Sequence, residues 1–166
     1  MCWHYYNSAV NAENTKATLV TEKEGLVTEK TNLETENEEI VEEKQLCADC
    51  SAEIVSIIRL LNAYATTFKQ LGAAMEKVKV NRQAYDKGKC YEISEQITSI
   101  REEFSEFQRT ILKTIREINE RILEISTRIG EIDTRLNQIE GLISGLNVTI
   151  SHKHWNCKAC RVLELE

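Results

Sequence analysis

The chain has 166 residues, a formal net charge of −6, six glycines and no proline. That length suits one domain of moderate size, and a chain rich in Glu, Lys, Ile and Leu without proline favours long helices over sheets. Basic residues are not clustered enough to indicate nucleic-acid binding. No uninterrupted apolar segment is long enough to cross a membrane.

The N-terminal sequence MCWHYYNSAV lacks the basic start and the apolar core of a signal peptide. We therefore expect a protein made in the cytoplasm, with export by a route that needs no cleavable signal peptide left open.

Residues 19–25 and 26–32, LVTEKEG and LVTEKTN, repeat one heptad almost letter for letter. Because the pattern keeps its phase over many heptads, it predicts one continuous helix from about residue 8 to 78, with Ser8 as a possible N-cap. One heptad position recurs as Tyr5, Ala12, Leu19, Leu26, Leu33, Ile40, Cys47, Ile54, Leu61, Phe68 and Met75.

The segment VNRQAYDKGKC, residues 80–90, interrupts this period and is predicted to be the turn. A second helix is predicted from about residue 91 to 150. Its seam alternates steps of four and three, and the apolar residues upstream predict one extra step of four, a stutter, between Ile111 and Ile115. The upstream seam residues are Ile97, Ile100, Phe104 and Phe107; the later ones are Ile118, Ile122, Ile125, Ile129, Ile132, Leu136, Ile139, Ile143, Leu146 and Ile150.

Two helices of similar length joined by one turn predict an all-α antiparallel helical hairpin, a single domain over residues 1–166 with a Cys/His-containing tail at 151–160. A turn centred near residue 84 would place Leu61 near Phe107 and Leu26 near Leu142. A two-helix hairpin buries little surface, and Ile at both seam positions favours three or more helices. We therefore expect self-association or a helical partner to complete the core.

The six cysteines include two Cys-x-x-Cys pairs, Cys47 with Cys50 and Cys157 with Cys160. Such pairs resemble half-sites for zinc. The heptad pattern places Cys47 and Cys50 in the seam, which favours small core residues. A disulfide, or a zinc ion shared between chains, stays open for this pair. Cys90 is predicted to be a core residue at the start of the second helix.

The two chain ends suggest a zinc site of their own. Antiparallel pairing would bring Cys2 and His4 beside Cys157 and Cys160, and four such ligands suit a tetrahedral structural zinc. His152 or His154 could replace His4. A disulfide between the ends is the main alternative.

No motif for catalysis is present. The sequence lacks a Gly-rich phosphate loop and a nucleophile elbow, and the Cys-x-x-Cys pairs have no neighbouring strand of the kind that redox enzymes use. We expect a protein without enzymatic activity.

The opening WHYYNSAVNAENTKATLVTEKEGLV and the hinge VNRQAYDKGKCYEISEQI resemble small helical accessory proteins associated with LXG-domain toxins of Gram-positive type VII secretion. The W-x-G turn of related small secreted proteins is absent. Tyr91 and Glu95 match the Y-x-x-x-[DE] export signal, but at the start of the second predicted helix.

This resemblance implies a helical hairpin that binds the helical domain of a secreted toxin, or another small helical protein, and helps it into the secretion machinery. The alternative is a structural coiled-coil tether or scaffold that self-associates and is clasped by zinc. Nucleic acid and membrane insertion are not expected in either case.

Overall fold

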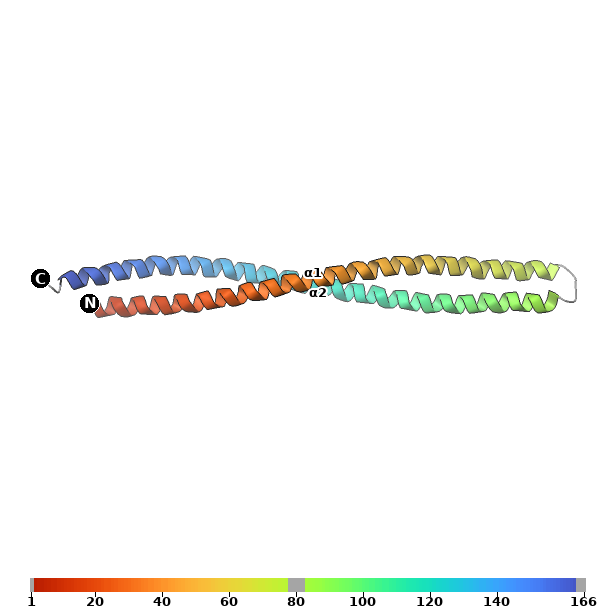
Figure 1. Ribbon diagram of the computed structural model, residues 1–166, viewed down its shortest axis with the longest axis horizontal. Coiled ribbons are helices and arrows are strands. Elements are labelled where there is room, and N and C mark those ends of the chain that lie inside the picture. Colours follow the sequence, from red (N-terminus) through yellow and green to blue (C-terminus); the bar gives the residue numbers. More distant parts are fainter. Residues whose placement is uncertain (1, 78–82, 164–166) are drawn as a thin grey trace. The chain divides into compact units, whose positions relative to one another are not determined.

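The computed structural model describes the backbone of residues 2–77 and 83–163 and the side chains of residues 6–77 and 86–153. These residues form two α-helices, α1 (Cys2–Lys77) and α2 (Gln83–Leu163), and no strand. The helices run antiparallel and pack against each other (Figure 1). The predicted all-α antiparallel hairpin is therefore confirmed.

The first helix is continuous through the Cys47–Cys50 segment, as its unbroken heptad phase predicts. It begins earlier than expected, at Cys2, so the predicted N-cap at Ser8 is wrong. The Ser8 hydroxyl instead lies against the ammonium group of Lys153 on α2.

Helix α2 is longer at both ends than the sequence predicts. It starts at Gln83, so residues 83–90 belong to the helix and not to the turn, and it continues past residue 150 through the Cys/His-containing tail to Leu163. Contacts across the hairpin account for the early start despite Gly88: Lys87 forms an ion pair with Glu76, and Cys90 is buried. Tertiary packing here outweighs weak helix propensity.

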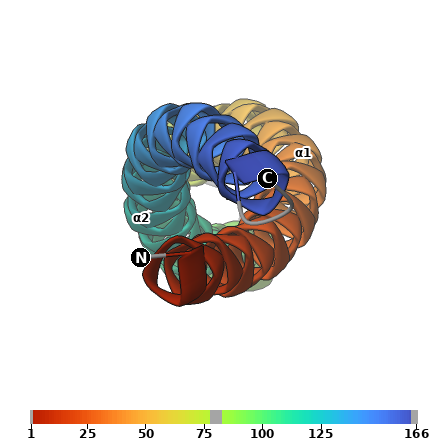
Figure 2. The same cartoon turned by 90° about the vertical axis from the view of Figure 1, so that its left-hand side faces the viewer.

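The hairpin divides into two compact units. Unit 1 contains residues 1–38 and 123–166, and unit 2 contains residues 39–122. In unit 1, the first turns of α1 and the last turns of α2 lie at the same end, and the helices coil around each other (Figure 2).

The buried seam of α2 alternates between two heptad positions, which we call a and d. Ile125, Ile132 and Ile139 occupy d in unit 1 and are at most 1% exposed. In unit 2, Ile111, Ile118 and Cys90 occupy the same position and are also buried. The largest fully buried side chains are thus the isoleucines of α2 in unit 1.

The predicted stutter in α2 is absent. Ile100 and Phe107, assigned to the seam from sequence, are exposed. The steps of four and three run without interruption through Ser94, Arg101 and Gln108, which are buried or half-buried. The apolar residues do not follow the seam here. The a position is held instead by polar side chains that can form hydrogen bonds within the hairpin.

Two of these polar residues bond directly across unit 2. The Ser94 side chain is fully buried and its Oγ donates to the Ala65 carbonyl oxygen at 2.9 Å. Arg101 Nη1 donates to Asn62 Oδ1 at 3.2 Å. These bonds offset the cost of placing polar groups in the seam.

The pairing register also differs from the expected one. A Cβ built on Gly72 would lie 3.5 Å from the Cys90 Cβ and 3.1 Å from the Tyr91 ring, so the helices approach closely there. Residue numbers of opposed seam positions therefore add to 162, whereas a turn centred near 84 would require 168. In this register Leu61 lies level with Arg101 and not Phe107, and Leu26 lies level with Leu136 and not Leu142. The difference agrees with the early start of α2 at Gln83.

Candidate partner-binding surface

The repeated heptad LVTEK in unit 1 matches a repeat in α2. Glu22 and Glu29, seven residues apart, accept paired bonds from Arg135 and Arg128; their shortest N–O distances are both 2.7 Å. Lys23 and Lys30 bond to Glu140 at 2.8 Å and to Asp133 at 2.6 Å. Both copies of the repeated heptad thus form the same pair of bridges, and all four bridges agree with one antiparallel register of unit 1.

The lysines of this repeat occupy the a position of α1, which sequence reasoning missed. Only the d position of α1 is apolar throughout. The half-buried a position in the first part of α1 holds Lys16, Lys23, Lys30, Asn37 and Lys44. Lysine stems cover apolar surface while the charged ends reach acidic partners. The spacing of seven is visible in the sequence and could have revealed this column.

Glu22 and Glu29 bind their arginines tightly enough to shift their acidity. The hydrogen bond from Arg135 lowers the pKa of Glu22 below its ordinary value of 4.5; desolvation opposes this shift, and the charge of Arg135 adds to it. The bond from Arg128 lowers the pKa of Glu29 in the same way. A depressed pKa in the folded state adds stability above the unfolded value, which is lost as pH falls through the folded pKa.

Acidification should therefore weaken unit 1 within a definite pH range. We expect the thermal midpoint to fall as pH decreases below 4.5, and the Glu22→Gln, Glu29→Gln double variant to lose part of that dependence. Far-UV circular dichroism at low salt measures both, since salt screens exposed charge pairs. Glu24→Gln with Glu38→Gln, at exposed positions of the same helix, is the control. An unchanged pH profile in the Glu22, Glu29 variant would contradict the role of these bridges.

The Glu22 and Arg135 pair defines one flank of the seam, the g position of both helices. Over residues 57–71 and 93–107 of unit 2 the same position is apolar on both helices. It holds Ile57, Tyr64 and Leu71 on α1, and Ile93, Ile100 and Phe107 on α2. The flank that carries ion pairs in unit 1 is therefore hydrophobic in this part of unit 2.

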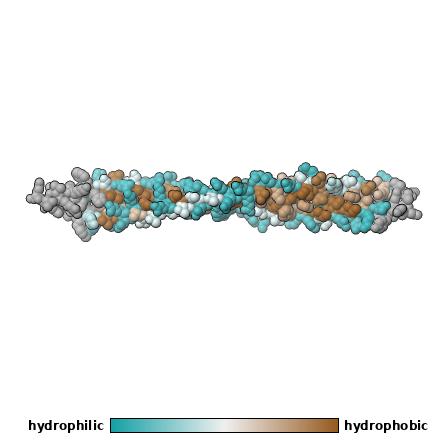
Figure 3. Space-filling model, in the orientation of Figure 1, coloured by the Kyte–Doolittle hydropathy of each residue, from teal (hydrophilic) through white to brown (hydrophobic). Residues whose placement is uncertain are grey.

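Most of these unit 2 side chains are exposed. Tyr64, Phe107 and the neighbouring Leu60 are 57%, 53% and 57% exposed. We call the set Ile57, Leu60, Tyr64, Leu71, Ile100 and Phe107 the apolar side of unit 2. In Figure 3, hydrophobic surface gathers over unit 2 on the face shown.

The register of unit 2 brings the two halves of this apolar side together. Residue numbers of opposed g positions add to 157, as Glu22 with Arg135 shows in unit 1. With the seam of unit 2 in register at Gly72 and Cys90, Ile57 lies beside Ile100. The exposed residues of α1 and α2 thus lie on one side of unit 2, along both helices. Contiguous exposed apolar surface of this kind marks interaction sites.

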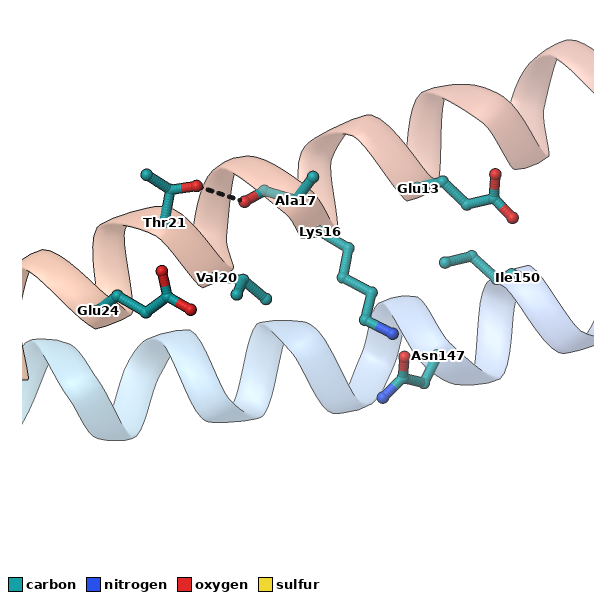
Figure 4. A pocket seen from close by; sticks show the side chains of 8 residues that line it. All are labelled: Glu13, Lys16, Ala17, Val20, Thr21, Glu24, Asn147 and Ile150. Carbon is teal, nitrogen blue, oxygen red and sulfur yellow. Dashed lines mark hydrogen bonds between the residues drawn. The ribbon is translucent and has the colours of Figure 1, made fainter.

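A hollow lies on unit 1, on the flank of its seam opposite to the Glu22 and Arg135 pair. Figure 4 shows Val20 of α1 facing α2, with Ile150 at one end and Lys16 extending toward Asn147. Val27 and Ile143 continue the hollow along the hairpin. Glu13, Lys16 and Glu24 also line it, so its character is mixed and less apolar than the side of unit 2.

The cysteines fall into two groups. Cys47 and Cys50 are half-buried free thiols on α1, and Cys90 is a buried free thiol, as expected for a core residue. The proposed zinc ligands Cys2, His4, Cys157 and Cys160, and the substitute His154, lie outside the residues whose side chains are described. His152 is exposed. Within residues 6–77 and 86–153, no group of three or more His, Cys, Asp or Glu side chains could hold a metal ion.

Among the described residues, neither helix contains a stretch long and apolar enough to span a membrane. Comparisons with protein-family models, with curated proteins and with solved structures find no match to this chain. The unit 2 surface is thus the feature on which a function can be argued.

Proposed function

We propose that this chain is a non-enzymatic partner or targeting factor, which binds the helical domain of a secreted toxin of the LXG class and promotes its export by type VII secretion. The observation that carries the proposal is the apolar side of unit 2. Six exposed apolar side chains from two helices in fixed register form a surface suited to a further helix. An amphipathic helix binds an apolar surface of this kind through residues spaced three and four apart. The sequence resemblance supplies the class of partner.

Co-expression with the products of neighbouring genes tests this function. The proposal predicts a stable complex of defined stoichiometry with a long helical protein, detected by size-exclusion chromatography with light scattering. A chain that forms only its own oligomer and is indifferent to every candidate would contradict it.

A self-associating coiled-coil tether is the second candidate. One observation favours it: isoleucine dominates both the a and the d positions of α2 from Ile111 onward, a pattern that favours bundles of three or more helices. Since each chain supplies two helices, this candidate predicts that light scattering finds a dimer or larger species whose mass does not change when a helical partner is added.

The zinc clasp remains a prediction that concerns the end of unit 1. The first turns of α1 and the last turns of α2 lie at the same end of unit 1 (Figure 2), which supports this prediction. A structural zinc would add its binding free energy to folding. We expect about one zinc per chain by elemental analysis, lost with reduced helicity in the Cys157→Ser, Cys160→Ser variant. Metal-free protein with a disulfide between its ends would contradict the clasp and leave the hairpin intact.

A further inference from the structure

Acidic residues border the apolar side of unit 2. The positions next to it on the outer surfaces of the helices are c and f of the heptad. Over residues 49–74 and 89–113 they carry five acids and two bases. The acids are Asp49, Glu53, Glu92, Glu103 and Glu106; the bases are Lys89 and Lys113.

Part of this charge is balanced within α2. Lys89 pairs with Glu92 at 2.8 Å, Arg109 pairs with Glu106 at 2.7 Å, and Lys113 lies 3.5 Å from Glu117. Five acids against two bases still leave the c and f positions with an excess of negative charge. The other flank of unit 2 has no such excess of acids, because over the same residues it carries three bases, Arg59, Lys69 and Arg109, and two acids, Glu95 and Glu102. An apolar strip with acidic borders is therefore specific to one side of the unit.

We infer that this side accepts one amphipathic helix of a partner protein whose apolar stripe is flanked by lysine and arginine. The inference rests on the proposed function and names the chemistry of its partner. Phe107 lies level with Cys50, so the apolar side from Phe107 to Leu71 extends roughly 32 Å along α1, which corresponds to about six turns of a bound helix. Tyr64 and Phe107 are its expected anchors, since aromatic residues dominate the binding energy of interfaces.

The borders also argue against a second copy of this chain as the occupant. Two copies joined through their apolar sides would bring the same acidic borders toward each other, and juxtaposed like charges oppose association. A partner helix with basic flanks gains attraction at the same positions. The charge pattern thus distinguishes a foreign helix from self-association.

Two designed peptides of 21 residues provide the probe. Both carry the same leucine and isoleucine stripe; one has lysine and arginine on the flanks and the other has glutamate. Fluorescence anisotropy with the full-length protein should show that the basic peptide binds at least about tenfold more tightly, and that added salt weakens it.

The matched variants locate the binding. Leu60→Glu with Tyr64→Glu changes two exposed residues of the apolar side and should weaken the basic peptide at least about tenfold. Leu142→Glu with Val148→Glu, equally exposed but in unit 1, should leave binding unchanged. Circular dichroism confirms that both variants keep the helical content of the parent.

Several results would overturn the inference. Equal affinity for the acidic and basic peptides would show that the acidic borders do not select the partner. Binding that survives Leu60→Glu with Tyr64→Glu would show that the peptide does not bind to the apolar side of unit 2. Sedimentation that reveals a dimer broken by the same two substitutions would make a second copy the occupant.

The outcome is separable from that of the proposed function. If a co-expressed helical protein stays bound to the Leu60→Glu, Tyr64→Glu variant, the function stands and this docking side is wrong. If the basic peptide binds as expected while no secreted helical protein does, the docking side stands and the function is wrong.

Discussion

Replacing Ile132 with alanine is expected to lower the free energy of unfolding by about 3 kcal/mol. The side chain is 1% exposed at a d position of α2, between the equally buried Ile125 and Ile139. Its truncation leaves a cavity in the narrow seam of a two-helix unit, where few other side chains can fill it. Urea denaturation followed by far-UV circular dichroism measures the change.

Leu123→Ala provides the control, because Leu123 also lies on α2 of unit 1 but is 68% exposed. We expect it to change the free energy by less than about 0.5 kcal/mol. Equal losses for the two variants would show that the isoleucine column is not the core of the unit.

Replacing Asn37 with isoleucine is expected to stabilise the protein by about 1–2 kcal/mol. Asn37 is half-buried at an a position of α1, and its Oδ1 is buried without a hydrogen-bond partner. The register places it level with Ile125, so an apolar side chain would fill the layer and remove an unpaired acceptor. A polar residue at such a position favours one register and one number of helices at a cost in stability.

Thermal unfolding and light scattering together test this second prediction. We expect Asn37→Ile to raise the midpoint and to broaden the distribution of oligomers. Asn32→Ile, at an exposed position of the same helix, should do neither. A lower midpoint for Asn37→Ile would mean that the amide makes a contact that stabilises the seam.

Much of the fold follows from the sequence because one heptad position of α1 is apolar for ten repeats. Every described member of that series, from Ala12 to Met75, is buried or half-buried. The other column was missed because it holds Lys16, Lys23, Lys30 and Asn37, and apolar periodicity cannot detect a polar seam. The long turn was wrong because Asp86 and Gly88 are typical of turns, while packing of Cys90 against Gly72 holds this segment helical.

The candidate surface was hidden by the same assumption. Ile100 and Phe107 were assigned to the seam since they are apolar and spaced correctly relative to Phe104. In the structure Arg101 and Gln108 occupy the seam, and the alternating steps of four and three continue through them to Ile111. Ile100 and Phe107 are therefore exposed and belong to the apolar side of unit 2. The apparent stutter in the apolar pattern was the sequence signal for their exposure.

The antiparallel register of unit 2 underlies both its packing and its apolar side, and a single engineered disulfide tests it directly. The Cβ of residue 72 would lie 3.5 Å from the Cys90 Cβ, within the range that a disulfide requires. With the other five native cysteines replaced by serine, Gly72→Cys should form an intramolecular disulfide with Cys90 on mild oxidation, seen as a mobility shift that reductant reverses. Ala73→Cys, on the exposed face, should not. If Gly72→Cys stays reduced, while in a Cys90→Ser background it joins a cysteine placed at Gln96, the helices pair as a turn centred near residue 84 would require, and the register described for unit 2 is wrong.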